Sequence, residues 1–152
     1  MEIKELGHLV LYVKDIKTSA SFYENVLGWQ RIQLSKSFLN SPVALFSSGR
    51  THHELLLIEV GSGSPVQKGH RLGMYHFGLK VGDSQDELIF AHNDLTENNV
   101  RITGYSDHTI THSIYIEDPD GNEIELYIDT GVDWKTNPDL IAAAIKPLTY
   151  LP

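Results

Sequence analysis

The alternation of apolar and polar residues repeats once along the chain. The segments that start at His8 and at His76 share the pattern H-x-x-L-x-V-x-D, and the second copy begins 68 residues after the first. Both segments are short, apolar and β-branched, as strands are. A fixed offset between similar segments indicates an internal repeat, so we expect two copies of one structural unit.

A helical pattern follows each of these strands. After the first, apolar residues recur at helical spacing at Ile16, Ala20, Tyr23 and Leu27. Gly28 is placed to end that helix. After the second, Ser84 and Glu87 form a capping box, and Asn98–Asn99 can close the helix. The apolar face of this second helix consists of Leu88, Ala91 and Leu95.

Three strand-like segments complete each unit. They are roughly 29–34, 43–48 and 53–60 in the first half, and roughly 101–105, 111–117 and 122–129 in the second. The last two are joined by Asp118-Pro-Asp-Gly121, a strong turn signal. Each half is therefore β-α-β-β-β, and the predicted fold class is α+β with two tandem βαβββ modules. Because neither half could bury its sheet alone, we expect the halves to pack together or to swap between chains.

Composition marks the boundaries between these parts. Gly61-Ser-Gly-Ser-Pro65 is a flexible connector. The predicted parts are module 1 at about 4–60, a linker at 61–70, module 2 at about 71–130 and a C-terminal tail at 131–152. The tail is expected to carry a short helix at about 138–145. The apolar residues of the tail are too numerous for a free end: Trp134, Leu140, Ile141, Ile145, Leu148 and Tyr150. We therefore expect the tail to pack on the sheet or on a partner chain.

Charge and composition exclude several classes of function. The chain has 152 residues, a net charge of −8 and no cysteine. The negative charge disfavours nucleic acid and anionic membranes as partners, because both attract basic patches. Without cysteine there are no disulfides, thiolate metal sites or cysteine nucleophiles. The sequence shows no signal-peptide pattern and no apolar run near the ~20 residues of a membrane span, so the expected location is cytoplasmic.

Histidine and glutamate supply the candidate metal ligands. His8 and His76 hold the same place in the two copies of the repeat, and repeat symmetry would bring the two strand starts near each other. In the last strand, Glu123, Glu125 and Tyr127 alternate with apolar residues and so share one face. Two imidazoles and one carboxylate form the ligand set of non-haem Fe(II) oxygenases, which leaves positions open for substrate and O2. We therefore predict a metal site made of His8, His76 and Glu125.

The segment that ends at this glutamate is typical of a known family. With the two histidines, Asp118-Pro-Asp-Gly-Asn-Glu-Ile-Glu125-Leu resembles the vicinal oxygen chelate superfamily, which includes glyoxalase I, bleomycin-resistance proteins and type I extradiol dioxygenases. The resemblance covers about residues 4–130. It implies one domain over residues 1–152, in which the two modules form a curled, barrel-like mixed sheet around a divalent metal.

Three further residues match the type I extradiol dioxygenases in particular. Those enzymes open the last strand of their first module with a His-His pair, and His53 is here the second member, which acts as acid–base. They also carry a Tyr ten residues before the ligand Glu, within a segment like S-x-Y-x-x-x-P-x-G-x-E-x-E, and Tyr115 fits that spacing. A His upstream of that Tyr corresponds to His108 or, less well, to His112.

The resemblance implies ring cleavage of a catechol-like aromatic diol by O2, as part of aromatic compound catabolism. Fe(II) is the expected metal, with Mn(II) or another divalent ion as alternatives. His53 is expected to exchange protons, Tyr115 to donate a hydrogen bond to a substrate oxygen, and His108 to assist at the other side of the substrate. The expected assembly is a homodimer or a higher homo-oligomer.

Two other functions remain open. A glyoxalase-type isomerase would add a fourth ligand from the last strand of the first module, where Glu59 or Glu54 could supply it. A fourth ligand would leave less room for O2, and His53 and Tyr115 would then have no obvious role. A bleomycin-resistance-like binding protein would sequester an aromatic drug without metal, and the retention of all three ligand residues argues against it.

The role of Tyr115 depends on the register of the last two strands, because a one-residue slip reverses every side chain. A four-residue loop at 118–121 would pair Glu117 with Asn122 and set Tyr115 opposite Ile124, away from the metal. A five-residue loop at 117–121 would set Tyr115 opposite Glu123, on the metal side. We predict the metal-side arrangement, because the Tyr–Glu spacing matches the extradiol pattern.

Overall fold

The computed structural model describes residues 1–34, 39–70 and 72–151, and it divides the chain into two compact units, Met1–Val66 and Gln67–Pro152. The boundary falls within the predicted linker at 61–70. The first residue predicted for module 2, residue 71, and the last residue of the tail, 152, lie outside the described residues.

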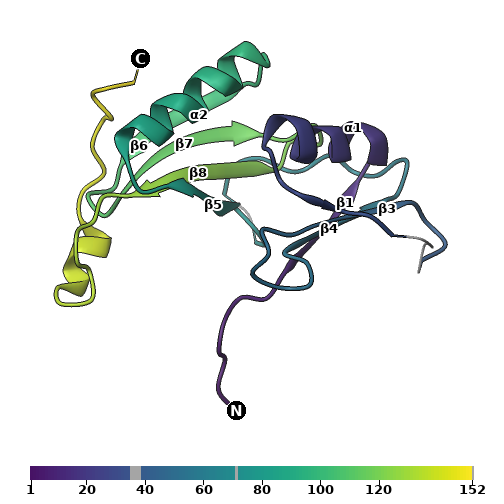
Figure 1. Cartoon of the computed structure of the whole chain (residues 1–152), viewed down its shortest axis with the longest axis horizontal. Helices are drawn as coiled ribbons and strands as arrows, with labels where there is room; N and C mark the ends of the chain where they lie inside the picture. Colours follow the sequence, from purple (N-terminus) through teal and green to yellow (C-terminus); the bar gives the residue numbers. More distant parts are fainter. Residues whose placement is uncertain (35–38, 71, 152) are drawn as a thin grey trace. The chain divides into compact units, whose positions relative to one another are not determined.

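The first unit is a four-stranded mixed sheet with a helix. Its elements are β1 (Leu9–Val13), α1 (Ile16–Ser21), the π-helical turn η1 (Phe22–Val26), β2 (Arg31–Ile32), β3 (Val43–Phe46) and β4 (Leu55–Glu59). The strand order is β1-β4-β3-β2, with β1 parallel to β4 and the other pairs antiparallel (Figure 1). The helix ends at Gly28, whose positive φ of 66° suits glycine. The prediction that Gly28 ends this helix is therefore confirmed.

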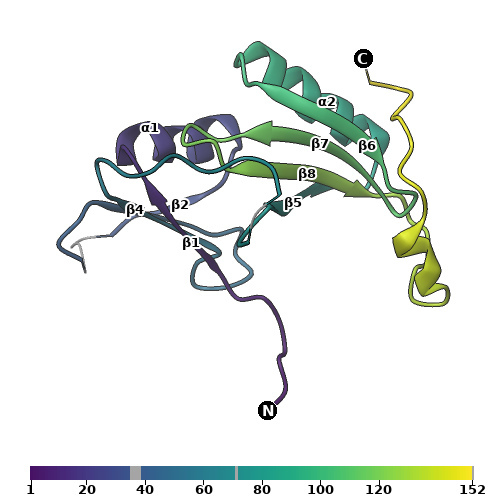
Figure 2. The same cartoon turned by 180° about the vertical axis from the view of Figure 1, so that it is seen from behind.

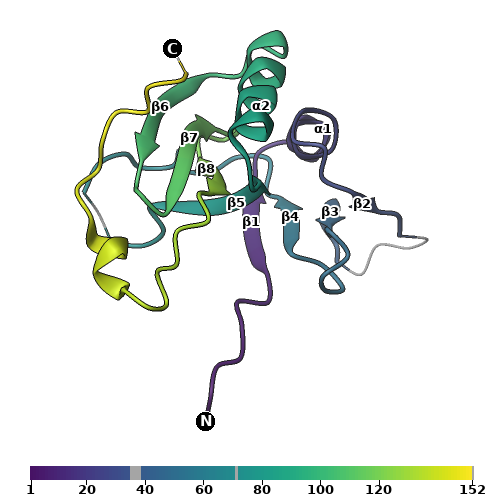
Figure 3. The ribbon, with the colours of Figure 1, turned by 60° about the vertical axis from the view of Figure 1, so that its left-hand side comes forward.

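The second unit repeats this topology. Its elements are β5 (His76–Gly82), α2 (Gln85–Glu97), β6 (Ile102–Asp107), β7 (Thr111–Glu117), β8 (Glu123–Asp129) and the 3-10 helix η2 (Pro138–Ala142). The order β5-β8-β7-β6 and the strand directions match those of the first unit. The chain is thus an α+β protein of two tandem βαβββ modules, as predicted. The described strands form two separate four-stranded sheets and no closed barrel; the sheet of the second unit is curled (Figure 3).

One face of the second sheet forms an apolar core with α2. The helix α2 packs against β7 and β8. Alternate residues of these two strands are fully or almost fully buried: Ile114, Ile116, Ile124, Leu126 and Ile128. Leu88 and Leu95 of α2 are buried with them. Burying each such side chain contributes about 1.5–3 kcal/mol. Because strand residues alternate between faces, this core leaves Glu123, Glu125 and Tyr127 on the opposite face.

The turn between β7 and β8 fixes their register. Oδ1 of Asp118 accepts hydrogen bonds from the backbone N–H groups of Asp120, at 3.0 Å, and Asn122, at 2.8 Å. Gly121 has a φ of 87°, which favours glycine. Glu117 pairs with Glu123, so Tyr115 lies directly opposite Glu125. The prediction that Tyr115 shares a face with Glu125 is confirmed, but the loop is 118–122 and the cross-strand partner of Tyr115 is Glu125, not Glu123.

The tail is attached to the second unit near its end. Lys146 exchanges two backbone hydrogen bonds of 2.9 Å with Asp107, and Leu148 and Leu151 are buried. Figure 2 shows this segment running beside the second unit. Trp134 and Ile145 stay largely exposed. The tail therefore packs on its own unit as predicted, but only through its last residues.

No helix in the described part of the chain is long and apolar enough to cross a membrane.

Candidate active site

Two of the three predicted metal ligands lie side by side on the polar face of the second sheet. The parallel pairing of β5 with β8 sets His76 opposite Glu123 and Gly78 opposite Glu125. Nε2 of His76 is 3.3 Å from Oε2 of Glu125. The side chain of His76 is 27% exposed and that of Glu125 is 17% exposed. Donor atoms that share one ion at bond lengths of ~2.0–2.2 Å lie ~3 Å apart when coordination is at right angles. This pair of donors therefore fits a common divalent ion.

Glu125 is held in place through its other oxygen. Oε1 accepts a hydrogen bond of 2.7 Å from the hydroxyl of Ser113 and one of 3.2 Å from the hydroxyl of Tyr115. Ser113 is fully buried on β7. Because both donors contact Oε1, Oε2 is the oxygen that faces His76. The carboxylate is thus fixed by the neighbouring strand with one oxygen directed at the imidazole.

A glycine keeps this carboxylate accessible. A Cβ placed on Gly78 would lie 3.8 Å from Oε2 of Glu125 and 3.3 Å from the ring of Tyr127. A side chain at this position would therefore start in van der Waals contact with the oxygen that faces His76. The absence of a side chain at Gly78 is a second feature that fits a ligand bound at Glu125.

Tyr115 connects the glutamate to a second histidine. Nε2 of His108 is 2.8 Å from the hydroxyl of Tyr115, which itself donates to Glu125. That hydroxyl has one proton, so when it is donated to Glu125 the contact with His108 requires a proton on Nε2 of the imidazole. Burial, followed by the charge of Glu125, raises the pKa of Tyr115 to about 12. Tyr115 is therefore a protonated hydrogen-bond donor at neutral pH.

The other candidate histidine of this region has a different partner. Nδ1 of His112 is 2.9 Å from the hydroxyl of Tyr150 in the tail, and its Nε2 is 3.6 Å from Asp107. His108 contacts Tyr115, whereas His112 contacts the tail. Among the described residues, the hydrogen bonds therefore connect His108 to Glu125 through Tyr115, and they connect His112 to the tail.

The first unit gathers three histidines at the start of β1 and β4. The ring centroids of His8 and His53 are 4.6 Å apart, and Nδ1 of His52 is 2.6 Å from Nδ1 of His53. Burial, and then the charges of His52 and His8, lower the pKa of His53. A lowered pKa keeps this imidazole neutral and able to accept a proton at neutral pH.

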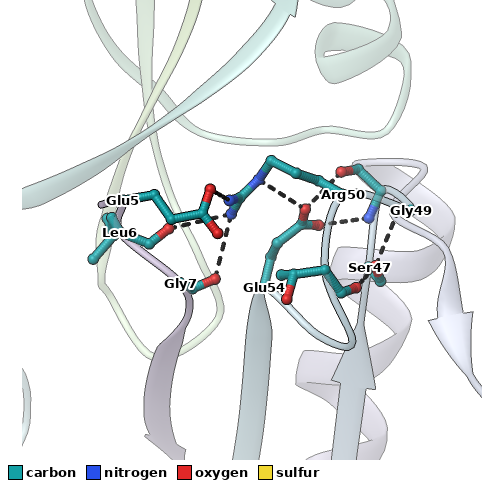
Figure 4. A network of polar contacts seen from close by, with 9 residues as sticks. Glu5, Leu6, Gly7, Ser47, Gly49, Arg50 and Glu54 are labelled. Carbon is teal, nitrogen blue, oxygen red and sulfur yellow. Dashed lines mark hydrogen bonds and ion pairs between the residues drawn. The ribbon is translucent and has the colours of Figure 1, made fainter. Parts of the chain in front are cut away.

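Glu54 and Glu59, the two candidates for a fourth ligand in the first unit, have structural roles. Oε2 of Glu59 accepts a hydrogen bond of 2.8 Å from the backbone N–H of Ile16, the first residue of α1. Glu54 accepts hydrogen bonds from Ser48 and lies 3.2 Å from Nε of Arg50 (Figure 4). Although burial works to raise it, the bonds from Ser48 and the charge of Arg50 hold the pKa of Glu54 below its usual value.

The complete triad of His8, His76 and Glu125 stays a prediction, because His8 belongs to the first unit and the other two ligands to the second. Among the residues that the structure describes, no group of three or more His, Asp or Glu side chains is arranged to hold a metal ion. The fit to a metal rests on the His76–Glu125 pair, on the two hydroxyls that hold Oε1, and on the space at Gly78.

Sequence reasoning gave no role to three residues of this face: Ser113, Gly78 and Glu123. The first was part of the matched segment, but its contact with Glu125 depends on the strand register. Gly78 was visible only as a small residue within a strand pattern, which often marks a close approach. The contact of Glu123 with His76 follows from the parallel pairing of β5 and β8.

The two mixed sheets have the same strand order and define a duplicated βαβββ scaffold. In the second sheet, a histidine at the start of one strand and a glutamate on its neighbour form a pair of potential metal ligands. The chain belongs to the Glyoxalase/Bleomycin resistance protein/Dioxygenase superfamily, whose family model matches residues 5–126. Members of this superfamily commonly bind a divalent metal.

Individual relatives agree with this assignment. The chain is 31% identical over 129 residues to a catechol-2,3-dioxygenase of Bacillus subtilis, with 84% of this chain and 42% of that protein covered. It is 31% identical over 128 residues to a virulence protein of Salmonella typhimurium, covering 83% and 85%. A glyoxalase/dioxygenase structure from Nostoc punctiforme has a TM-score of 0.69 at 22% identity, covering 83% and 91%. The chain thus spans less than half of the Bacillus relative and most of the Salmonella one.

Proposed function

We propose that the protein is an Fe(II)-dependent extradiol dioxygenase that cleaves a catechol-like aromatic diol with O2. The observation that carries this proposal is the hydrogen-bonded chain from His108 through Tyr115 to Glu125, on the same sheet face as His76. The extradiol pattern names a ligand glutamate, a donor tyrosine and an assisting histidine, and this chain of contacts joins the three candidates for those roles. The likeness to a catechol-2,3-dioxygenase supports the same reaction class.

The residues have separate roles in this proposal. His8, His76 and Glu125 hold the metal, which supplies a Lewis acid for the diol and open positions for diol and O2. Tyr115 stays protonated and donates a hydrogen bond toward a substrate oxygen on which negative charge grows. His108 holds the Tyr115 hydroxyl in place. His53, neutral because its pKa is lowered, takes up and returns a proton.

The register of the first unit argues against the glyoxalase-type alternative. Leu9 pairs with Leu55, and in the second unit Phe77 pairs with Ile124. Aligned on these pairs, the position that matches Glu125 is Leu56, which is 8% exposed. The two glutamates that could have supplied a fourth ligand are bonded to the start of α1 and to Ser48 and Arg50. We therefore propose three protein ligands, not four.

Anaerobic reconstitution tests the proposal. The full chain is loaded with Fe(II) without oxygen, and O2 uptake is then followed with a panel of catechols. The expected result is O2 consumption coupled to a coloured ring-cleavage product. Stoichiometric metal without O2 uptake on any catechol would favour another reaction of the superfamily, and protein that takes up no metal would favour a binding protein. Elution volume in size-exclusion chromatography tests the expected assembly, a homodimer or a higher homo-oligomer.

A further inference from the structure

Two buried polar atoms of the second unit face each other without a hydrogen bond. They are Nδ1 of His76 and Oε1 of Glu123, and neither has a hydrogen-bond partner among the described residues. The two atoms are 3.4 Å apart. Buried polar groups are nearly always paired, so two that remain unpaired and adjacent need an explanation. A shift of a few tenths of an ångström would bring them within the 2.7–3.2 Å range of an N–H···O bond.

The surroundings of Glu123 leave His76 as its natural partner. Glu117 lies directly opposite Glu123 on β7, but its carboxylate is already paired with Lys68 at 2.8 Å and Arg101 at 3.5 Å. His76 lies opposite Glu123 on the other side, on β5. A carboxylate in this position can accept a hydrogen bond from a ring N–H and cannot donate one when ionised.

Such a bond would fix His76 in the way that Glu125 is already fixed, through the donor or acceptor atom that does not face the other residue. Ser113 and Tyr115 occupy Oε1 of Glu125 and leave Oε2 toward His76. A hydrogen bond from Nδ1 of His76 to Glu123 would place the ring proton on Nδ1 and leave the lone pair of Nε2 toward Glu125. Metal-bound histidines commonly donate their second ring N–H to a carboxylate, which fixes the tautomer and the ring orientation.

We infer that Glu123 is a positioning residue for His76: it accepts the Nδ1 proton, so that Nε2 is unprotonated and directed at Oε2 of Glu125. This inference rests on the proposed metal-binding function of His76 and Glu125. It concerns the protein before metal is added, so it can be tested without any activity measurement.

The first test reads the tautomer of His76 in the metal-free full chain. Two-bond 15N–1H spectra at pH ~8.5, above the usual imidazole pKa, distinguish a proton on Nδ1 from one on Nε2. The wild type should carry it on Nδ1. Glu123→Gln keeps an acceptor oxygen and should preserve this tautomer, whereas Glu123→Leu should shift it toward Nε2–H. Glu117→Leu, which removes the carboxylate directly opposite, is the matched control and should change nothing.

The second test measures affinity for Fe(II) alone by anaerobic calorimetry. Loss of such a carboxylate typically weakens metal binding 10–100-fold, so we expect that range for Glu123→Leu and near wild-type affinity for Glu123→Gln and Glu117→Leu. Thermal unfolding of each variant verifies that it folds.

Different results separate this inference from the proposed function. An Nε2–H tautomer in the wild type, or an Nδ1–H tautomer that persists in Glu123→Leu, would overturn the inference whatever the activity. An Nδ1–H tautomer that depends on Glu123 in a protein that binds Fe(II) but cleaves no catechol would support the inference and contradict the dioxygenase proposal.

Discussion

The two modules share every strand pairing direction and yet differ in what they place at equivalent positions. In the second module, the strand beside the histidine-bearing strand carries Glu125, while the equivalent position of the first module is the buried Leu56. The position equivalent to Glu123 is Glu54, which is bonded to Ser48 and Arg50, whereas Glu123 has a free oxygen beside His76. Duplication of a fold therefore does not duplicate its chemistry. At this repeated position, the neighbouring residues decide whether the glutamate is engaged in structural hydrogen bonds, as Glu54 is, or keeps an unpaired oxygen, as Glu123 does.

The largest expected effect on the comparison of the two modules is a loss of bound metal, which should occur in one of two glutamate variants and not in the other. Glu125→Ala removes a proposed ligand and should reduce bound Fe(II) to background, with loss of catechol cleavage. Glu59→Ala in the first module removes a contact with the start of α1 and should lower the melting temperature while metal content stays stoichiometric. Metal analysis after anaerobic gel filtration compares them. Loss of metal in Glu59→Ala would instead indicate a four-ligand site.

A smaller effect is expected for Tyr115→Phe. The variant loses the hydroxyl that we propose as donor to the reacting oxygen, and one such donor typically contributes about 10²-fold in rate. Catechol turnover should fall by about that factor, while Fe(II) content stays near that of the wild type, because Ser113 still holds Oε1 of Glu125. Steady-state O2 uptake measures the rate. Unchanged turnover would remove Tyr115 from the mechanism.

Two buried serines compare the modules in terms of stability. Ser113 donates to the charged Glu125 at 2.7 Å, and Ser47 of the first module donates to the neutral carbonyl of Thr51 at 2.6 Å. Hydrogen bonds to charged groups contribute about 1.5–3 kcal/mol and neutral ones about 0.5–1.5 kcal/mol. Ser47 also accepts a hydrogen bond of 3.0 Å from the backbone N–H of Gly49, so Ser47→Ala removes two neutral bonds. Ser113→Ala should therefore lower the free energy of unfolding more per lost hydrogen bond than Ser47→Ala. Urea denaturation of the metal-free protein measures both, and equal losses per hydrogen bond would show that the carboxylate contributes nothing extra.

The smallest effects concern the helix starts, where each module uses an acidic side chain. Hydrogen bonds from Thr18 lower the pKa of Asp15 below 3.8, and the backbone N–H of Asp83 lowers that of Glu87 below 4.5. A lowered folded pKa means that each contribution is present above the unfolded value and is lost as pH falls through the folded value. Asp15→Ala and Glu87→Ala should therefore lower the melting temperature at pH 7, and the difference from the wild type should shrink as the pH falls from the ordinary carboxyl values of 3.8 and 4.5 through the lower folded values. A difference in melting temperature that did not shrink on acidification would have another cause.

Much of the fold followed from the sequence, because its signals are local. The duplicated strand pattern, the capping box at Ser84–Glu87 and the glycine at position 28 each act within a few residues. The described residues form the two α-helices and the eight strands expected of two βαβββ modules. The expected strands at 29–34 and 53–60 were too long, because only Arg31–Ile32 and Leu55–Glu59 pair with neighbours. The predicted tail helix at 138–145 is a shorter 3-10 helix at Pro138–Ala142.

The site was less accessible to sequence reasoning, because it depends on pairings between distant segments. That Tyr115 faces Glu125 is decided by one residue in the length of the 118–122 loop. That Leu56, and not Glu59, is the equivalent of Glu125 is decided by the parallel pairing of β1 with β4. The choice between His108 and His112 depends on the tail, which supplies Tyr150 as the partner of His112.

The hydroxyl of Tyr115 has a thermodynamic consequence, because its single proton is already engaged by Glu125. When a substrate accepts the hydrogen bond of Tyr115, the bond from Tyr115 to the carboxylate of Glu125 must break. A cation bound to Glu125 draws electron density from Oε1 and so lowers the free-energy cost of breaking that bond. By reciprocity, a substrate bound to Tyr115 alters the affinity of Glu125 for a cation. Substrate affinity and cation affinity are thus linked through one O–H bond, and titrating each in the presence of the other should reveal a coupling that Tyr115→Phe abolishes.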